Sequence, residues 1–313
     1  MYIKGGCNCS RLFLDICGMI NMVITMKERI LAFLTALILL FLSGCTAQDT
    51  PVQIAATTLP VYEFTYRLCQ DTGIAVTRLV TDNVSCLHDY SLNVRQIRAA
   101  EAAELIVISG AGLENFMDDL LEGKDTLDSS CGIELLTCHH EHDGEHHHEN
   151  DAHIWLSPEN AKIMAQNICA GLCSKYPEYE TTFRCNLTAL LTDLDALQQY
   201  GKTQLSSLSC RELITFHDGF SYLAQAFDLH ILEAIEEESG SEASAAELKH
   251  LITQVREYQL SAVFTETNGS VSAADIIAAE TGVAIYTLDM VMSGDSYFSA
   301  MRHNIDTLKE ALE

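Results

Sequence analysis

The chain has 313 residues, of which 48% are hydrophobic and 20% charged, so it can bury a core as one large domain or two smaller ones. Asp and Glu outnumber Lys and Arg by 44 to 18, which gives a net charge of −26 with histidine neutral. This balance argues against a nucleic-acid partner, because phosphate binding requires clustered Lys and Arg.

Residues 1–45 have the pattern of a targeting signal. A short basic segment at 26–29 precedes the uncharged run 30–42, which is too short for a membrane span of about 20 residues. The run ends in Leu42-Ser43-Gly44-Cys45, which resembles a bacterial lipobox. We therefore expect lipidation of Cys45 and a lipid anchor on the extracytoplasmic face of the membrane. A cleaved secretory signal is the alternative, and Met26 is a candidate start as well as Met1.

From residue 52 onward, short apolar runs alternate with amphipathic ones. Strands are predicted at 52–57, 74–80, 105–109 and 133–136, and helices at 61–70, 94–103 and 113–121. Such an alternation favours a parallel sheet flanked by helices. Pro158 then begins a helix that runs to about residue 175, with Ser157 as its N-cap.

A long apolar stripe at helical spacing follows, over residues 177–208. The alternation then resumes, with strands at 213–216, 230–234, 262–265 and 284–288 and helices at 219–227, 243–258, 273–281 and 297–311. We predict an α/β fold of two lobes, each with a roughly four-stranded, mainly parallel sheet flanked by helices, bridged by one long α-helix. The predicted boundaries are 46–176 for the N-terminal lobe, 177–208 for the linking helix and 209–313 for the C-terminal lobe.

Four residues that can bind a metal ion follow predicted strands or lie in the loops beyond them: His88, His153, His217 and Asp289. The crevice beyond the carboxyl ends of the strands is the usual binding place in open α/β sheets, so we expect these side chains to converge. Three neutral imidazoles and one carboxylate suit tetrahedral Zn²⁺, whereas Mn²⁺ favours more oxygen ligands. The neighbouring aspartates are candidates to hold the second imidazole nitrogens, or are ordinary turn residues: Asp89, Asp151 and Asp218.

Six histidines lie in an acidic, low-complexity loop at 139–149: His139, His140, His142, His146, His147 and His148. One interpretation is auxiliary, low-affinity capture of metal near the site, and the other is a replaceable spacer. Because protonated imidazole cannot bind a metal, we expect metal affinity to fall as the pH drops through about 6.5.

Two stretches carry a specific resemblance to a known family. Residues 151–158, Asp-Ala-His-Ile-Trp-Leu-Ser-Pro, resemble a D-P-H-x-W-x-x-P element, with Ala152 in place of its proline. Residues 216–222 resemble an H-[DN]-A-F-x-Y element, with Gly219 in place of its alanine, and residues 110–114 and 264–266 also match. Over 52–313 the chain is similar to the metal-binding solute-binding proteins of ABC importers that handle zinc and manganese. The resemblance implies two α/β lobes bridged by a long rigid helix.

The family pattern also bears on the metal and its fourth ligand. Members that favour manganese usually carry glutamate at the position of His217, so the resemblance favours zinc. The chain departs from the pattern after His88, where residues 91–94 replace the usual prolines, and after Asp289, where Met290-Val291 replaces proline-leucine. Glu266 is therefore an alternative fourth ligand.

Together these observations predict a monomeric, lipid-anchored protein that binds Zn²⁺ with high affinity outside the cytoplasmic membrane. The resemblance implies that it delivers the ion to an ABC-type permease and its ATPase and is not an enzyme. One alternative is a zinc-dependent hydrolase on an α/β scaffold, which would use a zinc-bound hydroxide. The other is a manganese-binding or adhesin-like relative.

Overall fold

The computed structural model describes residues 53–82, 84, 87, 90–142, 145–235, 243–267, 269 and 271–313, without the side chains of 138–149. All of the described residues belong to one compact unit, Pro51–Glu313. The predicted signal with Cys45, the predicted ligand His88 and the side chains of the six clustered histidines lie outside the described part.

The N-terminal sheet consists of four parallel strands in the order β2-β1-β3-β4. Its strands are β1 (Ile54–Ala56), β2 (Val76–Arg78), β3 (Leu105–Ile108) and β4 (Thr126–Asp128). Alternate residues enter different clusters: Ile54 and Ala56 pack on one side, and Ala55 on the other. Both faces are covered, which is why β1 and β3 read as continuous apolar runs.

The fourth strand of this sheet differs from the prediction. Residues 133–136 were expected to form it, but they are irregular, and β4 pairs with β3 instead. Leu127 is the one large apolar residue of β4, so the strand has almost no periodic signal. Ile133, Leu135 and Leu136 pack against the core from a loop, which explains their apolar character.

The C-terminal sheet also has four parallel strands, in the order β10-β9-β7-β8. Its strands are β7 (Glu212–Thr215), β8 (His230–Ala234), β9 (Ala262–Glu266) and β10 (Ala284–Leu288). The predicted strands agree with these bounds to within one residue. The two four-stranded parallel sheets confirm the predicted fold class.

Several helices begin at residues whose side chains cap them. Asn93 forms a capping box with Gln96, Ser244 forms one with Glu247, and Ser157 accepts a hydrogen bond from Asn160 N as predicted. The helices are α2 (Leu59–Leu68), α3 (Val94–Ala102), α4 (Asp118–Leu121), α5 (Pro158–Lys175), α6 (Glu180–Gln204), α7 (Ser221–Ala226), α8 (Ala245–Glu257), α9 (Ser272–Thr281) and α10 (Tyr297–Leu312). Short 3₁₀ turns are η1 (Leu113–Met117), η2 (Ile154–Leu156), η3 (Pro177–Tyr179) and η4 (Asp218–Phe220).

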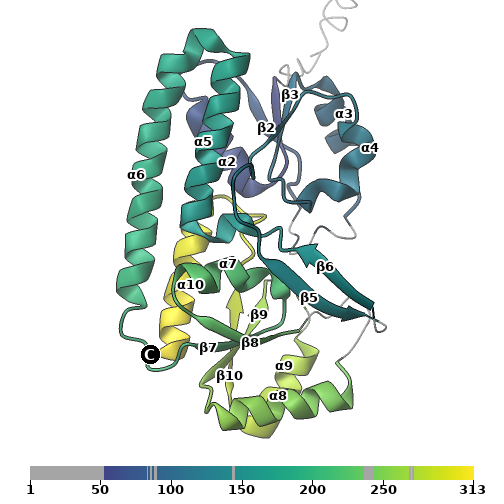
Figure 1. Cartoon of the computed structure of the whole chain (residues 1–313), viewed down its shortest axis with the longest axis vertical. Coiled ribbons are helices and arrows are strands. Elements are labelled where there is room, and N and C mark those ends of the chain that lie inside the picture. Colours follow the sequence, from purple (N-terminus) through teal and green to yellow (C-terminus); the bar gives the residue numbers. More distant parts are fainter. Residues whose placement is uncertain are drawn as a thin grey trace, which may run out of the picture. The chain divides into compact units, whose positions relative to one another are not determined.

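Helix α6 follows η3 and is about 37 Å long at 1.5 Å per residue. It packs against α2 and α5 near one end and against α10 near the other, as Figure 1 shows. Its buried stripe includes Phe183, Leu190, Leu194 and Leu197, all from the predicted stripe. The helix ends at Gln204 rather than at 208. We call residues 53–176 and 209–313 the N-terminal and C-terminal halves; the domain boundaries stay a prediction.

The histidine-rich stretch forms two strands rather than an irregular loop. β5 (Thr137–His142) pairs antiparallel with β6 (Glu145–Asn150), which brings His139 opposite His148 and His140 opposite His147 in register. Pairing satisfies backbone groups that a loop would leave to water. Figure 1 shows this pair separate from the two four-stranded sheets.

One buried hydrophobic cluster includes residues of both halves. It contains Phe64 and Trp155 from the N-terminal half and Met290, Tyr297 and Met301 from the C-terminal half.

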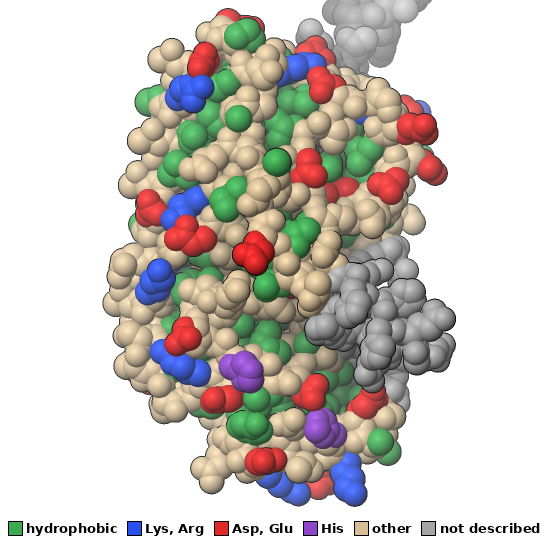
Figure 2. Space-filling model, viewed as in Figure 1, with side chains coloured by type: hydrophobic (Ala, Val, Ile, Leu, Met, Phe, Trp, Pro, Cys, Tyr) green, Lys and Arg blue, Asp and Glu red, His purple; other side chains and the backbone are tan. Residues whose placement is uncertain are grey.

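In the space-filling view of Figure 2, acidic side chains are scattered among Lys and Arg. Among the described helices, none combines the length and the apolar character that a membrane crossing requires.

Candidate metal centre

His153 lies between β6 and η2, and its side chain is oriented by a buried carboxylate. Oδ1 of Asp151 accepts hydrogen bonds from the backbone N of His153 at 2.8 Å and from its Nδ1 at 2.9 Å. A carboxylate can only accept here, so Nδ1 carries the proton and Nε2 carries the lone pair. His153 is 6% exposed and Asp151 2%. Asp151 thus fixes the tautomer that a metal ligand needs, as predicted for one of the neighbouring aspartates.

His217 follows β7 and enters the same place from the C-terminal half. It is 4% exposed, and its ring centroid lies 5.2 Å from that of His153, with the two ring planes nearly perpendicular. Nδ1 of His217 is 3.8 Å from Glu266 Oε2 and 3.9 Å from Asp218 Oδ1. Glu266 is the last residue of β9, next to β7 in the sheet. The carboxyl ends of neighbouring parallel strands therefore bring an imidazole and a carboxylate together.

Gly219 explains how closely the two histidine segments approach. A Cβ at this position would lie 2.7 Å from His153 Nδ1 and 2.4 Å from Met290 Cε. Gly219 and Met290, which both depart from the family pattern, therefore lie next to each other. The space that an alanine Cβ would take at 219 is used by the methionine, which stands where the pattern has proline.

Asp289 follows β10 in a turn whose backbone is firmly held. Its N donates to Asn304 Oδ1 at 2.8 Å, and its O accepts from Asn304 Nδ2 at 2.7 Å. Oδ1 accepts from Val291 N at 2.6 Å. The next carbonyl, Met290 O, accepts from Trp155 Nε1 at 2.8 Å, so the turn is hydrogen-bonded to the His153 segment.

The predicted ligands therefore have different outcomes. His153, His217 and the alternative ligand Glu266 lie in one buried region, and the Asp289 turn is hydrogen-bonded to the residue two positions after His153. His88 lies outside the described residues. Among the side chains that the structure describes, no three His, Cys, Asp or Glu residues are already arranged to hold a metal ion. The ligand set stays a prediction.

Glu114 lies in η1, beyond the carboxyl end of β3 in the N-terminal sheet. In the sequence it is noted only as part of a matching motif. Its carboxylate accepts hydrogen bonds from Thr57 Oγ1 at 2.6 Å, Ser109 N at 2.7 Å and Gly110 N at 3.0 Å. Complete burial raises the pKa of Glu114 to about 7, against the lowering effect of these hydrogen bonds. Glu114 thus ties the segments that follow β1 and β3 to each other.

Sequence reasoning missed the roles of Gly219 and Trp155. Both depend on approach between segments distant in the chain, which no local pattern encodes. The available signal was indirect: Trp155 is the only tryptophan of the chain and lies two residues after a predicted ligand.

Comparison with known proteins agrees with this architecture. The chain is 28% identical over 309 residues to the zinc-binding lipoprotein AdcA of Streptococcus pneumoniae, covering 91% of this chain but 61% of that protein. It is 28% identical over 294 residues to a putative metal-binding protein of Treponema pallidum, covering 87% of this chain and 93% of that one. The chain thus spans about three fifths of AdcA.

Solved structures show the same fold. A crystal structure of ZnuA matches with a TM-score of 0.73 at 28% identity, covering 84% of this chain and 100% of that chain. The Zn(II)-bound structure of AdcA from Streptococcus pneumoniae matches with a TM-score of 0.69 at 28% identity, covering 83% of this chain and 57% of that one.

A family model described as "zinc-uptake complex component A, periplasmic" matches residues 54–311, nearly the whole described part of the chain. An uptake component binds its solute rather than transforming it, so the family match fits the binding interpretation better than the hydrolase alternative. The chain belongs to this zinc-uptake component A family.

Proposed function

We propose that this protein binds one Zn²⁺ between its two halves and delivers the ion to an ABC-type importer. The observation that carries the proposal is the approach of two buried imidazoles, His153 and His217, from opposite halves, with ring centroids 5.2 Å apart. Two imidazoles at this distance can share one cation, and the carboxylates of Asp151 and Glu266 beside them add negative charge that favours it.

Zinc fits the donor set better than a harder ion does. His88, His153 and His217 would supply three nitrogens, and one carboxylate would complete a tetrahedral site. Asp289 is the proposed fourth ligand, because its Oδ1 is engaged by Val291 N and leaves Oδ2 for a metal. Glu266 is the alternative, since its Oε2 already lies 3.8 Å from His217 Nδ1. Four protein ligands would leave no position at which bound water could be activated.

The family supports a place outside the cytoplasmic membrane, since its model describes a periplasmic component. We further propose that acylated Cys45 anchors the protein to the membrane, that the protein acts as a monomer, and that a permease with its ATPase receives the ion. Two or three acyl chains on one cysteine are needed for stable anchoring. The six histidines of 139–149 are proposed as auxiliary metal-capturing residues.

Zinc and manganese titrations of the purified protein test the metal site. Wild type should bind one Zn²⁺ tightly and Mn²⁺ more weakly, whereas H88A/H153A/H217A should lose tight zinc binding. The matched control is H250A, which removes an exposed histidine paired with Glu233 at 3.0 Å and should bind zinc as wild type does. A tightly bound zinc in the triple variant would contradict the proposed site. Tighter binding of Mn²⁺ than of Zn²⁺ would favour the manganese alternative.

Titration of the protein with and without residues 139–149 addresses the histidine-rich segment. Deleting residues 139–149 should remove the weaker zinc equivalents and leave the tight one unchanged. Loss of the tight equivalent on deletion would instead place a ligand of the principal site in this segment.

A further inference from the structure

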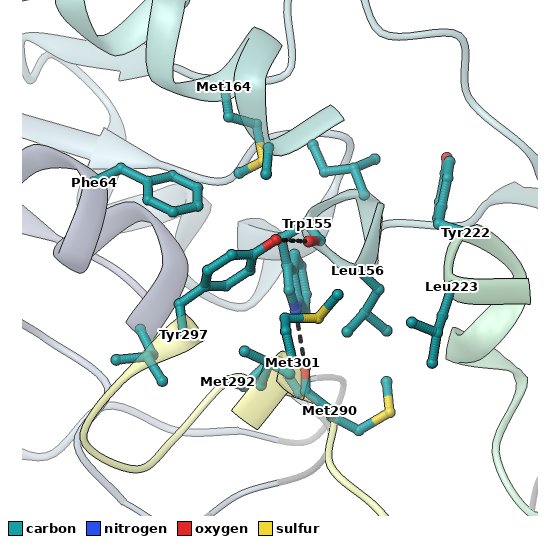
Figure 3. Packing of buried hydrophobic residues seen from close by; sticks show 14 of the residues in the cluster. Phe64, Trp155, Leu156, Met164, Tyr222, Leu223, Met290, Met292, Tyr297 and Met301 are labelled. Carbon is teal, nitrogen blue, oxygen red and sulfur yellow. Dashed lines mark hydrogen bonds between the residues drawn. The ribbon is translucent and has the colours of Figure 1, made fainter. Parts of the chain in front are cut away.

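Two buried hydrogen bonds join Trp155 to the C-terminal half, one through its indole and one through its backbone carbonyl. The indole Nε1 of Trp155 donates to Met290 O at 2.8 Å, and the hydroxyl of Tyr297 donates to Trp155 O at 2.8 Å. Figure 3 shows both bonds, with Tyr297 pointing toward Trp155 inside the apolar cluster. Trp155 and Tyr297 are fully buried, so each bond forms where water cannot replace it.

The turn that receives the indole hydrogen bond is strained. Val291 has φ +60°, a conformation that is an outlier for a β-branched residue, and its side chain is fully buried. Such a conformation persists only where the surroundings determine it. Here the surroundings include two donors from the N-terminal half: Trp155 Nε1 on Met290 O, and Leu59 N on Met292 O at 3.3 Å.

We propose that Trp155 is a positioning residue, whose indole N–H holds the Asp289 turn in the strained form that presents the Asp289 carboxylate to the metal. Because Trp155 lies two residues after His153, the same short segment carries one ligand and sets the place of another. The hydrogen bond from Trp155 Nε1 to Met290 O then helps to set the separation between an imidazole of one half and a carboxylate of the other. The inference rests on the proposed function, since it takes Asp289 as a ligand.

A double-mutant cycle on zinc affinity tests this coupling. W155F removes the N–H and keeps an aromatic ring, and it should raise the zinc Kd about 10- to 100-fold, the range for losing a residue that orients a metal ligand. In a D289A background the same change should raise Kd less than about twofold, because the carboxylate that Trp155 positions is already gone. A purely structural role of Trp155 would weaken zinc binding equally in both backgrounds.

Y297F is the matched control. It removes an equally buried inter-half hydrogen bond from the same cluster, but the lost partner is Trp155 O and not the Asp289 turn. It should lower the melting temperature as W155F does while changing the zinc Kd less than about threefold. If Y297F weakens zinc as much as W155F, general loosening of the cluster is responsible and the proposal fails.

Two further readouts separate the possible failures. Because Trp155 is the only tryptophan, replacing it biosynthetically with the benzothiophene analogue removes the N–H alone, and the same loss of affinity is expected even if W155F folds poorly. In W155F, the visible absorption of the Co²⁺-loaded protein should be weaker than in wild type, because a four-coordinate site that loses its carboxylate gains water. If wild type and D289A bind zinc equally, Asp289 is not a ligand and the inference fails, while the proposed function survives through Glu266. If wild type binds no zinc, the proposed function itself fails.

Discussion

The contact at Gly219 gives the sharpest prediction for the metal centre. In G219A, the new Cβ would lie 2.7 Å from His153 Nδ1 and 2.8 Å from His153 Cε1, whereas ordinary contacts begin at 3.4 Å. The methyl group of Met290, at 2.4 Å, can swing away, but the imidazole is held by Asp151. The ring must therefore move by about 0.7 Å, several times the ~0.2 Å tolerance of a metal–ligand distance.

We expect G219A to raise the zinc Kd about 10- to 100-fold, which corresponds to about 1.4 to 2.8 kcal/mol. Competition with a chromophoric zinc chelator measures Kd, and Trp155 fluorescence reports binding independently, because its ring centroid lies 5.3 Å from that of His153. G171A on α5 is the control. Its Cβ would lie 2.0 Å from Leu127 Cδ1, so the substitution should lower stability without changing zinc affinity. Wild-type zinc affinity in G219A would refute the placement of His153.

Three further predictions concern Asp151, Glu114 and Leu194. D151N should raise the zinc Kd about 10- to 100-fold, because a neutral amide stabilises the oriented His153 less well, and an unchanged Kd in the chelator assay would contradict this role. The pKa of Glu114 is raised by burial from 4.5 to about 7, so the folded state holds that proton more tightly and stability is lost as the pH rises from about 4.5 to 7. Relative to E114Q, the unfolding free energy of the metal-free wild type should therefore fall by about 3 kcal/mol over that range in urea titrations, and a constant difference would rule this out. L194A should cost about 2 to 5 kcal/mol of stability, since Leu194 is fully buried on α6, with zinc affinity unchanged; a loss below 1 kcal/mol would show that the stripe does not support the core.

Most of the fold could be predicted because its signals are local. In the C-terminal half, the strands at 230–234 and 284–288 have the predicted bounds, since each is a compact run between turn residues. β4 could not be predicted, because a three-residue edge strand with one large apolar side chain leaves no pattern, whereas the apolar loop at 133–136 imitates one.

The site was predictable as a set of residue types but not as an arrangement. His153 and His217 are predicted because they follow predicted strands or lie in the loops beyond them, within recognisable motifs. The structure brings their ring centroids to 5.2 Å, and their role as ligands stays a prediction. Two features depend on distances between segments that are more than 70 residues apart in the chain. They are the packing of Met290 against Gly219 and the hydrogen bond from Trp155 to the Asp289 turn. Single-sequence patterns contain no information about such distances. His88 stays a prediction, outside the described residues.

The central claim is that imidazoles from both halves share one ion. X-ray absorption at the zinc edge of the 1:1 complex tests it directly. The account predicts three imidazole nitrogens and one carboxylate oxygen at about 2.0–2.2 Å, with the outer-shell scattering typical of imidazole. Sulfur at about 2.3 Å, or a first shell with at most one imidazole, would contradict it.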